Sequence, residues 1–230
     1  MKAMLLAAGY GKRLSPLTLE TPKPLLEVAG KPLLQHHIER LAANGIHELV
    51  INTSWLAQQI EDYFGDGSKF GVSISWSREP EPLETGGGIT NAIKLLGEEP
   101  FLVVNGDVWS DYPLGLASAY KLASDKLAWL LMVENPSHNP EGDYGLVDGL
   151  INDICKTKYT FSGISIMCPQ LFVDYARTHL GQKTFPLRDV LNPAIKNGRV
   201  VGTFYDGKWC DVGTLDRYQR LNHSLRAVNS

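Results

Sequence analysis

The sequence lacks the features that would indicate a membrane, a nucleic acid or an oxidising compartment. No run approaches the ~18 consecutive apolar residues of a membrane-spanning helix. Lys and Arg number 22 against 25 Asp and Glu, so there is no basic excess of the kind that nucleic-acid binders carry. The three cysteines include no Cys-x-x-Cys pair, which favours a reducing compartment. The apolar run near the start is too short for a secretory leader. We therefore expect a cytoplasmic protein that binds neither nucleic acid nor membrane.

Apolar runs and segments of helical periodicity alternate in the first half of the chain. Strands are expected at 3–8, 49–51, 72–76, 101–104 and 127–133, and helices at 32–44, 56–64 and 88–96. This alternation predicts an α/β fold, a Rossmann-like three-layer sandwich with a mostly parallel central sheet. In such sheets, ligands bind beyond the carboxyl ends of the strands.

The second half of the chain has a different residue pattern, but no linker separates it from the first half. Residues 135–143 are rich in Pro, Asn, Gly and Ser and predict a loop. Short strands are expected in 144–166 and at 199–205, and helices at 169–180, at 186–197 and from Thr214 onward. We therefore expect one domain over 1–230 with two parts, 1–134 and 135–230, the second of which ends in a closing helix.

A glycine-rich loop follows the first expected strand directly. The segment Gly9-Tyr10-Gly11-Lys12-Arg13 lets the backbone approach an anion, although a plain tight turn is the alternative. Leu14 replaces the third glycine of a dinucleotide fingerprint, and no Gly-Lys-Ser/Thr follows, so neither NAD nor a P-loop is indicated. Prolines restrict the backbone around Lys23, which favours a fixed lysine beside a triphosphate.

These residues carry a resemblance to a known family. The stretch from Leu6 to Thr18, with Pro22-Lys23-Pro24-Leu25, resembles the signature of sugar-1-phosphate nucleotidylyltransferases. The resemblance covers nearly the whole chain, and it implies that 1–134 is a nucleotide-binding half and 135–230 a sugar-phosphate lobe with the closing helix. It implies that Gly11, Lys12 and Arg13 embrace the triphosphate of a nucleoside triphosphate and that Lys23 lies at its phosphates. Ala8 and Gly9 are assigned to the same nucleotide-binding loop.

A second glycine-rich segment, Glu84-Thr85-Gly86-Gly87-Gly88, precedes an expected helix. On the residues alone, a flexible joint and a turn that leaves backbone groups free to bind a base are both open. The corresponding segment of the family lines the nucleobase. The resemblance therefore implies that Glu84, Gly86 and Gly87 bind the base.

Two carboxylates are candidates for a metal site. Asp107 follows the expected strand 101–104, and Asp211 precedes the last expected helix, and a helix-capping role is open for each. Two aspartates with phosphate oxygens and water would suit Mg²⁺, which prefers oxygen ligands. The family has matching motifs at both positions, which implies that Asp107 and Asp211 hold Mg²⁺ and that Arg13 and Lys23 are catalytic with them. His36 and His37 point different ways on a helix and are expected to be structural.

The part that binds the acceptor is less regular in sequence. By the resemblance, Gly145, Ser162 and Gly163 contact the sugar, Asp143 is a candidate hydroxyl acceptor, and Asn105 is a further candidate. The family's usual Glu-Lys-Pro triplet is missing. Lys156 and Lys158 are the nearby cations that could meet the acceptor phosphate, and the sequence does not choose between them.

The resemblance is strongest to family members that join UTP to N-acetylmuramic acid 1-phosphate in cell-wall recycling. Members that use mannose 1-phosphate with GTP, or phosphocholine with CTP, are alternatives. A catalytically silent nucleotide-binding regulatory subunit is a further alternative, which intact Arg13, Lys23, Asp107 and Asp211 disfavour. No left-handed helical repeat follows the catalytic part, so we expect a monomer.

Overall fold

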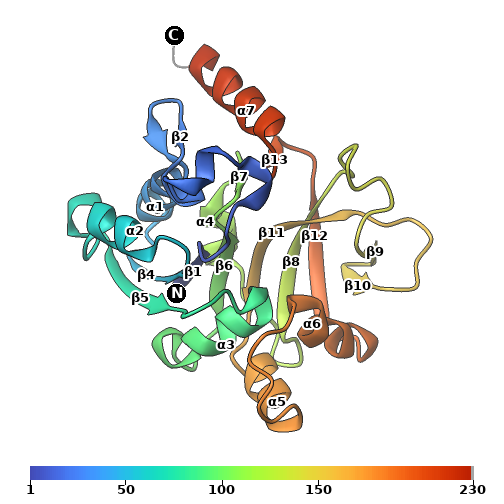
Figure 1. Ribbon diagram of the computed structural model, residues 1–230. Helices are drawn as coiled ribbons and strands as arrows, with labels where there is room; N and C mark the ends of the chain where they lie inside the picture. Colours follow the sequence, from blue (N-terminus) through green and yellow to red (C-terminus); the bar gives the residue numbers. More distant parts are fainter. Residues whose placement is uncertain (229–230) are drawn as a thin grey trace.

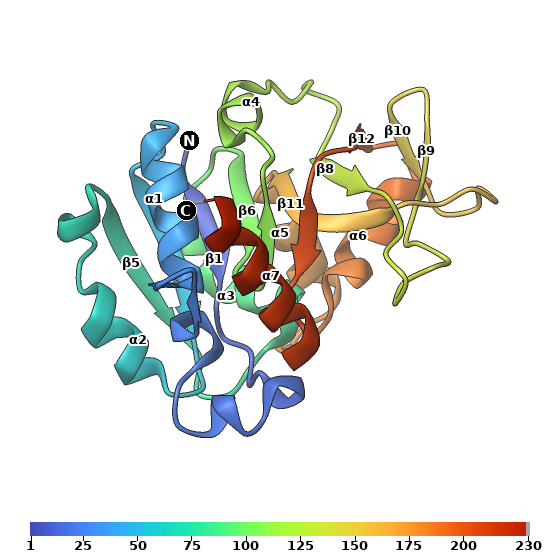
Figure 2. The ribbon, with the colours of Figure 1, turned by 90° about the horizontal axis from the view of Figure 1, so that it is seen from above.

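A computed structural model describes residues 1–228 and contains one nine-stranded sheet (Figure 1). The strands lie in the order β5-β4-β1-β6-β11-β8-β12-β10-β9. Their bounds are β1 Ala3–Leu6, β4 Glu48–Thr53, β5 Ser73–Arg78, β6 Phe101–Asn105, β8 Ala128–Val133, β9 Gly145–Val147, β10 Leu150–Asn152, β11 Thr160–Met167 and β12 Val200–Tyr205. The edge strands β5 and β9 lie at opposite ends of the molecule (Figures 1 and 2).

The sheet is mixed, with its parallel part in the first half of the chain. β5, β4, β1 and β6 run parallel, as do β8 and β12, whereas β11 runs antiparallel to both of its neighbours. The lobe strands β9 and β10 are antiparallel to each other. The expected α/β class with a largely parallel sheet is confirmed, and the antiparallel strands β9, β10 and β11 come from the second half of the chain.

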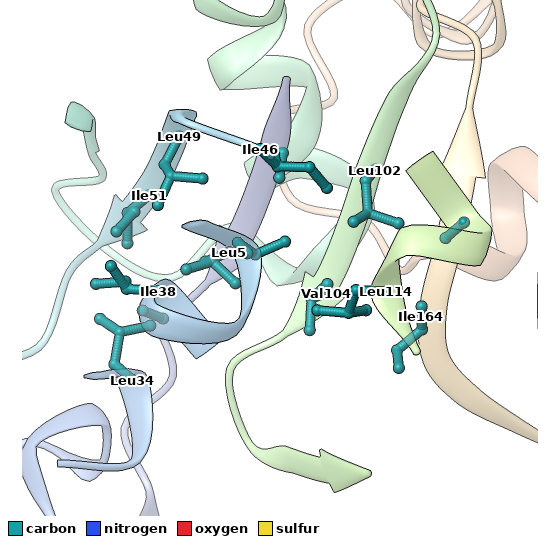
Figure 3. Packing of buried hydrophobic residues seen from close by; sticks show 14 of the residues in the cluster. Leu5, Leu34, Ile38, Ile46, Leu49, Ile51, Leu102, Val104, Leu114 and Ile164 are labelled. Atoms are coloured by element: carbon teal, nitrogen blue, oxygen red, sulfur yellow. The ribbon is translucent and has the colours of Figure 1, made fainter. Parts of the chain in front are cut away.

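Helices cover both faces of this sheet and bury two apolar cores. One core packs α1 (Leu33–Ala43), α2 (Ala57–Phe64) and α4 (Leu114–Ala119) against one face (Figure 3). The other packs α3 (Glu84–Leu96), α5 (Gln170–Thr178) and α6 (Leu187–Lys196) against the opposite face. β8 is fully buried and apolar at every position, as expected for a strand that is covered by helices on both faces. No helix within residues 1–228 is long and apolar enough to cross a membrane.

Several small elements lie at the edge where β1 and β6 end. They are the 3₁₀ turns Lys12–Leu14, Leu17–Leu19 and Lys23–Leu25, the ribbon of β2 (Glu27–Val28) with β3 (Lys31–Pro32), and the ribbon of β7 (Val108–Ser110) with β13 (Trp209–Asp211). The last helix, α7 (Leu215–Val228), packs beside these ribbons through Leu221, which clusters with Val28, Leu33 and Val212. The sequence did not indicate β7 or β13. It also placed the start of α3 at residue 88, but the helix begins at Glu84, so the three glycines lie inside it.

Candidate active site

The glycine-rich loop leaves β1 and turns immediately at Gly11. Gly11 has φ +65, a conformation that side chains with a Cβ rarely adopt, and its carbonyl accepts hydrogen bonds from Leu14 N (2.8 Å) and Thr18 Oγ1 (2.9 Å). The buried Leu14 anchors the turn that follows. Lys12 and Arg13 thus lie on a backbone that is fixed on both sides.

A cleft of about 360 Å³ opens where this loop meets the ends of the strands, and we call it the central cleft. Its volume is within the usual range for small-molecule sites. It is lined by residues from six segments of the chain: Leu6, Ala7, Ala8, Gly9, Gly11, Lys12, Arg13, Leu14, Lys23, Pro24, Asn52, Glu79, Pro82, Glu84, Thr85, Asn105, Gly106, Asp107 and Gly213. Most of the residues that the sequence analysis assigned to the nucleotide are therefore brought together.

Lys23 is held against the first candidate metal ligand. It lies in the 3₁₀ turn Lys23–Leu25, between the extended Pro22 and Leu26. Its Nζ is 2.8 Å from Oδ2 of Asp107, and its side chain is only 12% exposed. The prolines thus direct the ammonium group into the central cleft rather than into solvent.

The two candidate carboxylates are neighbours, although they are far apart in sequence. Asp107 lies in the tight connection between β6 and β7, and Asp211 ends β13, which pairs antiparallel with β7 so that Asp211 lies opposite Val108. The backbone N–H of Val212 also donates to the carbonyl of Asp107 at 2.7 Å. The β7–β13 ribbon thus holds Asp211 at the rim of the cleft, beside Gly213.

Asp211 has two partners that the sequence analysis missed. Its Oδ1 is 2.6 Å from Nη1 of Arg217, on the first turn of α7, and 2.9 Å from Nε2 of His138, in the loop 135–143. Arg217 Nη1 and His138 Nε2 are themselves 2.6 Å apart. Arg217 is six positions after Asp211 and belongs to no motif that we recognised, and His138 comes from a loop with no periodic signal.

The glycine-rich segment that we expected to bind the base has a different conformation from the one expected. Glu84 and Thr85 line the central cleft, and Glu84 begins α3 with φ +58. Gly86 and Gly87 are buried against the segment 183–185, and the N–H of Gly87 donates to the carbonyl of Phe185 at 3.1 Å. The expected turn with free backbone groups is instead the closely packed start of a helix, and the Gly87 N–H already has a partner within the protein.

A buried hydrogen-bond network lies behind this segment, and the sequence analysis did not predict it. The carboxylate of Glu79, 2% exposed, accepts from Asn52 Nδ2 (2.7 Å) and from Leu83 N (3.0 Å). Asn52 Oδ1 in turn accepts from Ala7 N at 2.8 Å. Burial raises the pKa of Glu79, although both hydrogen bonds favour its ionised form. This network connects the end of β1 to the start of α3 across the central cleft.

The candidate acceptor residues lie in several different environments. Asn105 lines the central cleft and touches Gly163, whose φ of +81 and lack of a side chain permit that contact. Ser162 is fully buried, and its hydroxyl accepts from Ile164 N. Asp143 accepts from Phe161 N at 2.8 Å, and Gly145 packs against Cys155.

The two candidate lysines are not part of the central cleft. Lys156 is exposed and Lys158 is half-buried, and neither lines the cleft. The expected structural role of the histidine pair agrees with the structure, because His36 Nε2 lies 2.7 Å from the carbonyl of Val28 and His37 is buried on α1.

A glycine loop with its own cations follows β1, one carboxylate follows the parallel strand β6, and a second lies on the adjoining ribbon, and this arrangement defines a class of enzyme that handles nucleoside triphosphates. The Nucleotidyl transferase family profile matches residues 2–227, and the chain belongs to this family. It is therefore a nucleotidyltransferase, as the sequence resemblance implied.

Individual relatives agree with this assignment. The N-acetylmuramate alpha-1-phosphate uridylyltransferase of Neisseria meningitidis serogroup B (strain ATCC BAA-335 / MC58) is 47% identical over 94% of this chain and 95% of its own. The mannose-1-phosphate guanyltransferase of Gibberella zeae is 32% identical over 93% of this chain, which spans only 61% of that longer protein.

Solved structures with low sequence identity share the fold. A solved structure from Bacillus anthracis matches 100% of this chain, and the match spans 97% of the chain in that structure, with a TM-score of 0.89 at 23% identity. The structure of an apo UDP-glucose pyrophosphorylase matches over the full length of both chains with a TM-score of 0.83 at 22% identity.

Proposed function

We propose that the chain transfers uridylyl from UTP to N-acetylmuramic acid 1-phosphate, forming UDP-N-acetylmuramic acid and pyrophosphate in cell-wall recycling. The observation that carries the chemistry is the convergence of Arg13, Lys23 and Asp107 in the central cleft, with Asp211 brought beside Asp107 by the β7–β13 ribbon. The 47% identity to the Neisseria enzyme over nearly the full length of both chains supports the choice of substrates.

The reaction needs no general base, because the attacking phosphate oxygen is already ionised at neutral pH. That oxygen forms a bond to the α-phosphorus of UTP while the bond from this phosphorus to the α,β-bridging oxygen breaks, and pyrophosphate leaves. Two anions must approach each other, so rate enhancement comes from positioning and from neutralising charge. Lys12 and Arg13 hold the triphosphate, and Lys23 and Arg13 stabilise the charge that develops.

The donor set at the cleft fits Mg²⁺. Asp107, just before β7, and Asp211, at the end of β13, offer only oxygen ligands, and phosphate oxygens and water would supply the remaining oxygen ligands that Mg²⁺ prefers. No group of three or more His, Cys, Asp or Glu suited to a metal occurs among residues 1–228, so the substrate itself must contribute ligands. When bound, Mg²⁺ would supply positive charge that offsets the repulsion between the two substrate anions.

The base is expected to lie near Glu84 and Thr85. Both line the central cleft, and the hydrogen-bond network of Glu79 and Asn52 holds the backbone on either side of the cleft. A site that hydrogen-bonds one base edge rejects other edges strongly, because its buried polar groups would be left unpaired.

The test is a matrix of four nucleoside triphosphates against muramate, glucosamine, mannose and glucose 1-phosphates, scored by pyrophosphate release with Mg²⁺. We expect the highest kcat/KM for UTP with N-acetylmuramic acid 1-phosphate. A clear preference for mannose 1-phosphate with GTP would overturn the substrate assignment, and release of no pyrophosphate from any pair would support a silent regulatory subunit. We also propose a monomer, which light scattering tests.

A further inference from the structure

The acceptor phosphate needs a cation, and neither of the two candidate lysines lines the central cleft. In this reaction a dianionic sugar phosphate must approach a triphosphate that already occupies Arg13 and Lys23. Lys156 is exposed and Lys158 half-buried, and neither lines the central cleft. A cation for the acceptor must therefore come from elsewhere in the fold.

Arg217 does not itself line the central cleft, but its guanidinium lies against Gly213, which does. Its Nη1 is 2.6 Å from Asp211 Oδ1, and its side chain is 15% exposed. A Cβ on Gly213 would collide with Arg217 Nη2 and would lie 2.8 Å from Asp211 Oδ2 and 3.0 Å from Arg13 Nη2. The absence of a side chain at Gly213, which lines the central cleft, thus lets two guanidinium groups and one carboxylate gather at the cleft rim.

The guanidinium of Arg217 is fixed but not saturated. Within residues 1–228 its hydrogen bonds use Nη1, toward Asp211 and His138, and Nε, toward Thr214 Oγ1 at 3.2 Å. Nη2 lies against Gly213, at the rim. Because guanidinium presents donors in a planar fork that matches phosphate oxygens, the free edge of this group suits a phosphate.

The two carboxylates of the ribbon have matching partners. Asp107 pairs with Lys23, and Asp211 pairs with Arg217. Each cation neutralises a carboxylate that is expected to bind Mg²⁺. If Mg²⁺ binds one of these carboxylates, the lysine or arginine that paired with it would be free to bind a substrate anion. Lys23 is assigned in this way to the triphosphate, which leaves Arg217 for the second anion.

We propose that Arg217 binds the phosphate of the sugar 1-phosphate, with His138 from the sugar-phosphate lobe lying beside it. The inference rests on the proposed function, because it assumes an acceptor with an anomeric phosphate. It does not depend on which sugar that acceptor carries. It replaces Lys156 and Lys158 as the source of the acceptor-side charge.

The test compares Arg217→Gln, Lys156→Gln and Lys158→Gln with Arg220→Gln as the matched control. Arg220 lies on the same helix, pairs with Asp216 and is 79% exposed. Binding of N-acetylmuramic acid 1-phosphate is measured by calorimetry with Mg²⁺ and a UTP analogue that cannot be cleaved between the α- and β-phosphates. Steady-state KM values for both substrates are measured alongside.

We expect Arg217→Gln to weaken acceptor binding and raise the acceptor KM by about 10- to 100-fold, the usual effect of one charge-assisted contact. The KM for UTP should stay within about 3-fold of the wild type, and Arg217→Lys should recover part of the acceptor affinity. An unchanged acceptor Kd with a lower kcat would show that Arg217 only positions Asp211. A loss of affinity confined to Lys156→Gln or Lys158→Gln would equally overturn the inference.

The outcome is separable from the proposed function. Turnover of the wild type with UTP and N-acetylmuramic acid 1-phosphate tests that function directly. If the wild type instead uses another sugar 1-phosphate from the matrix, the same variants are measured with that compound, and a selective loss of its binding in Arg217→Gln supports the role of Arg217.

Discussion

The ammonium group of Lys23 lies 2.8 Å from Oδ2 of Asp107, and both residues line the central cleft. The lysine side chain is mostly buried, whereas that of the aspartate is 40% exposed. An ion pair with one partner open to solvent contributes little to stability. Its position at the cleft therefore argues for a role in binding and catalysis more than in folding.

We predict that Lys23→Ala and Arg13→Ala each lower kcat by about 10²- to 10³-fold, with a smaller rise in KM for the nucleoside triphosphate. Both groups are proposed to act on charge that develops during the reaction. Steady-state kinetics check this, with Lys31→Ala as the control because Lys31 forms an exposed pair with Glu39 at 2.7 Å. A variant that changes only KM has lost ground-state binding alone.

We predict that Asp107→Asn and Asp211→Asn each nearly abolish turnover while the folded state persists. An amide keeps the shape of the side chain but removes the charge that Mg²⁺ requires. Pyrophosphate release over a Mg²⁺ titration checks activity, and circular dichroism checks the fold. The control is Asp62→Asn, an exposed aspartate on α2. Full activity of either variant with Mg²⁺ present would remove that residue from the metal site.

The sequence predicted the parts of the fold that repeat a simple pattern. Buried strands such as β1, β6 and β8 are continuous apolar runs, and the glycine loop follows β1 at once, so its place at the strand ends could be expected. The ribbon of β7 and β13 could not be expected, because three-residue strands carry no periodicity. That ribbon places Asp211 beside Asp107, and only the family resemblance had related the two.

The remaining discrepancies have a common cause in tertiary packing. Three consecutive glycines are poor helix formers, yet Gly86, Gly87 and Gly88 lie in α3. Neighbouring groups approach this part of the helix too closely to leave room for side chains, so glycine is needed there. Arg217 and His138 were missed because their role depends on α7 and the loop 135–143 meeting at Asp211. Neither residue has local spacing that indicates such a meeting.

We predict that Gly87→Ala lowers the free energy of unfolding by about 1–3 kcal/mol, the usual cost of overpacking. A Cβ at this position would collide with the backbone carbonyl of Lys183 and lie 3.0 Å from Leu83 Cβ. Urea unfolding of the ligand-free protein checks the prediction. Gly9→Ala is the control, since a Cβ there meets nothing within 4 Å. Equal stability of the two variants would show that α3 shifts freely.

We predict that His37 makes the protein less stable as the pH falls below 6.5. His37 is buried on α1, and burial, with Arg40 and His36 nearby, lowers its pKa to about 3. Between pH 6.5 and about 3 the unfolded chain therefore binds a proton that the folded chain does not. Since more protons are bound in the unfolded state, the free energy of unfolding drops with falling pH.

The size of this effect can be measured by comparison with His37→Gln, which does not titrate. From pH 7.5 to 5.5 the wild type should lose about 1.4 kcal/mol more than the variant, which is the linkage expected for one proton. Urea unfolding at pH 7.5, 6.5 and 5.5 provides the measurement, with His223→Gln as the variant that removes an exposed histidine. Parallel curves for the wild type and His37→Gln would mean that His37 takes up its proton in the folded state, against the burial that the structure shows.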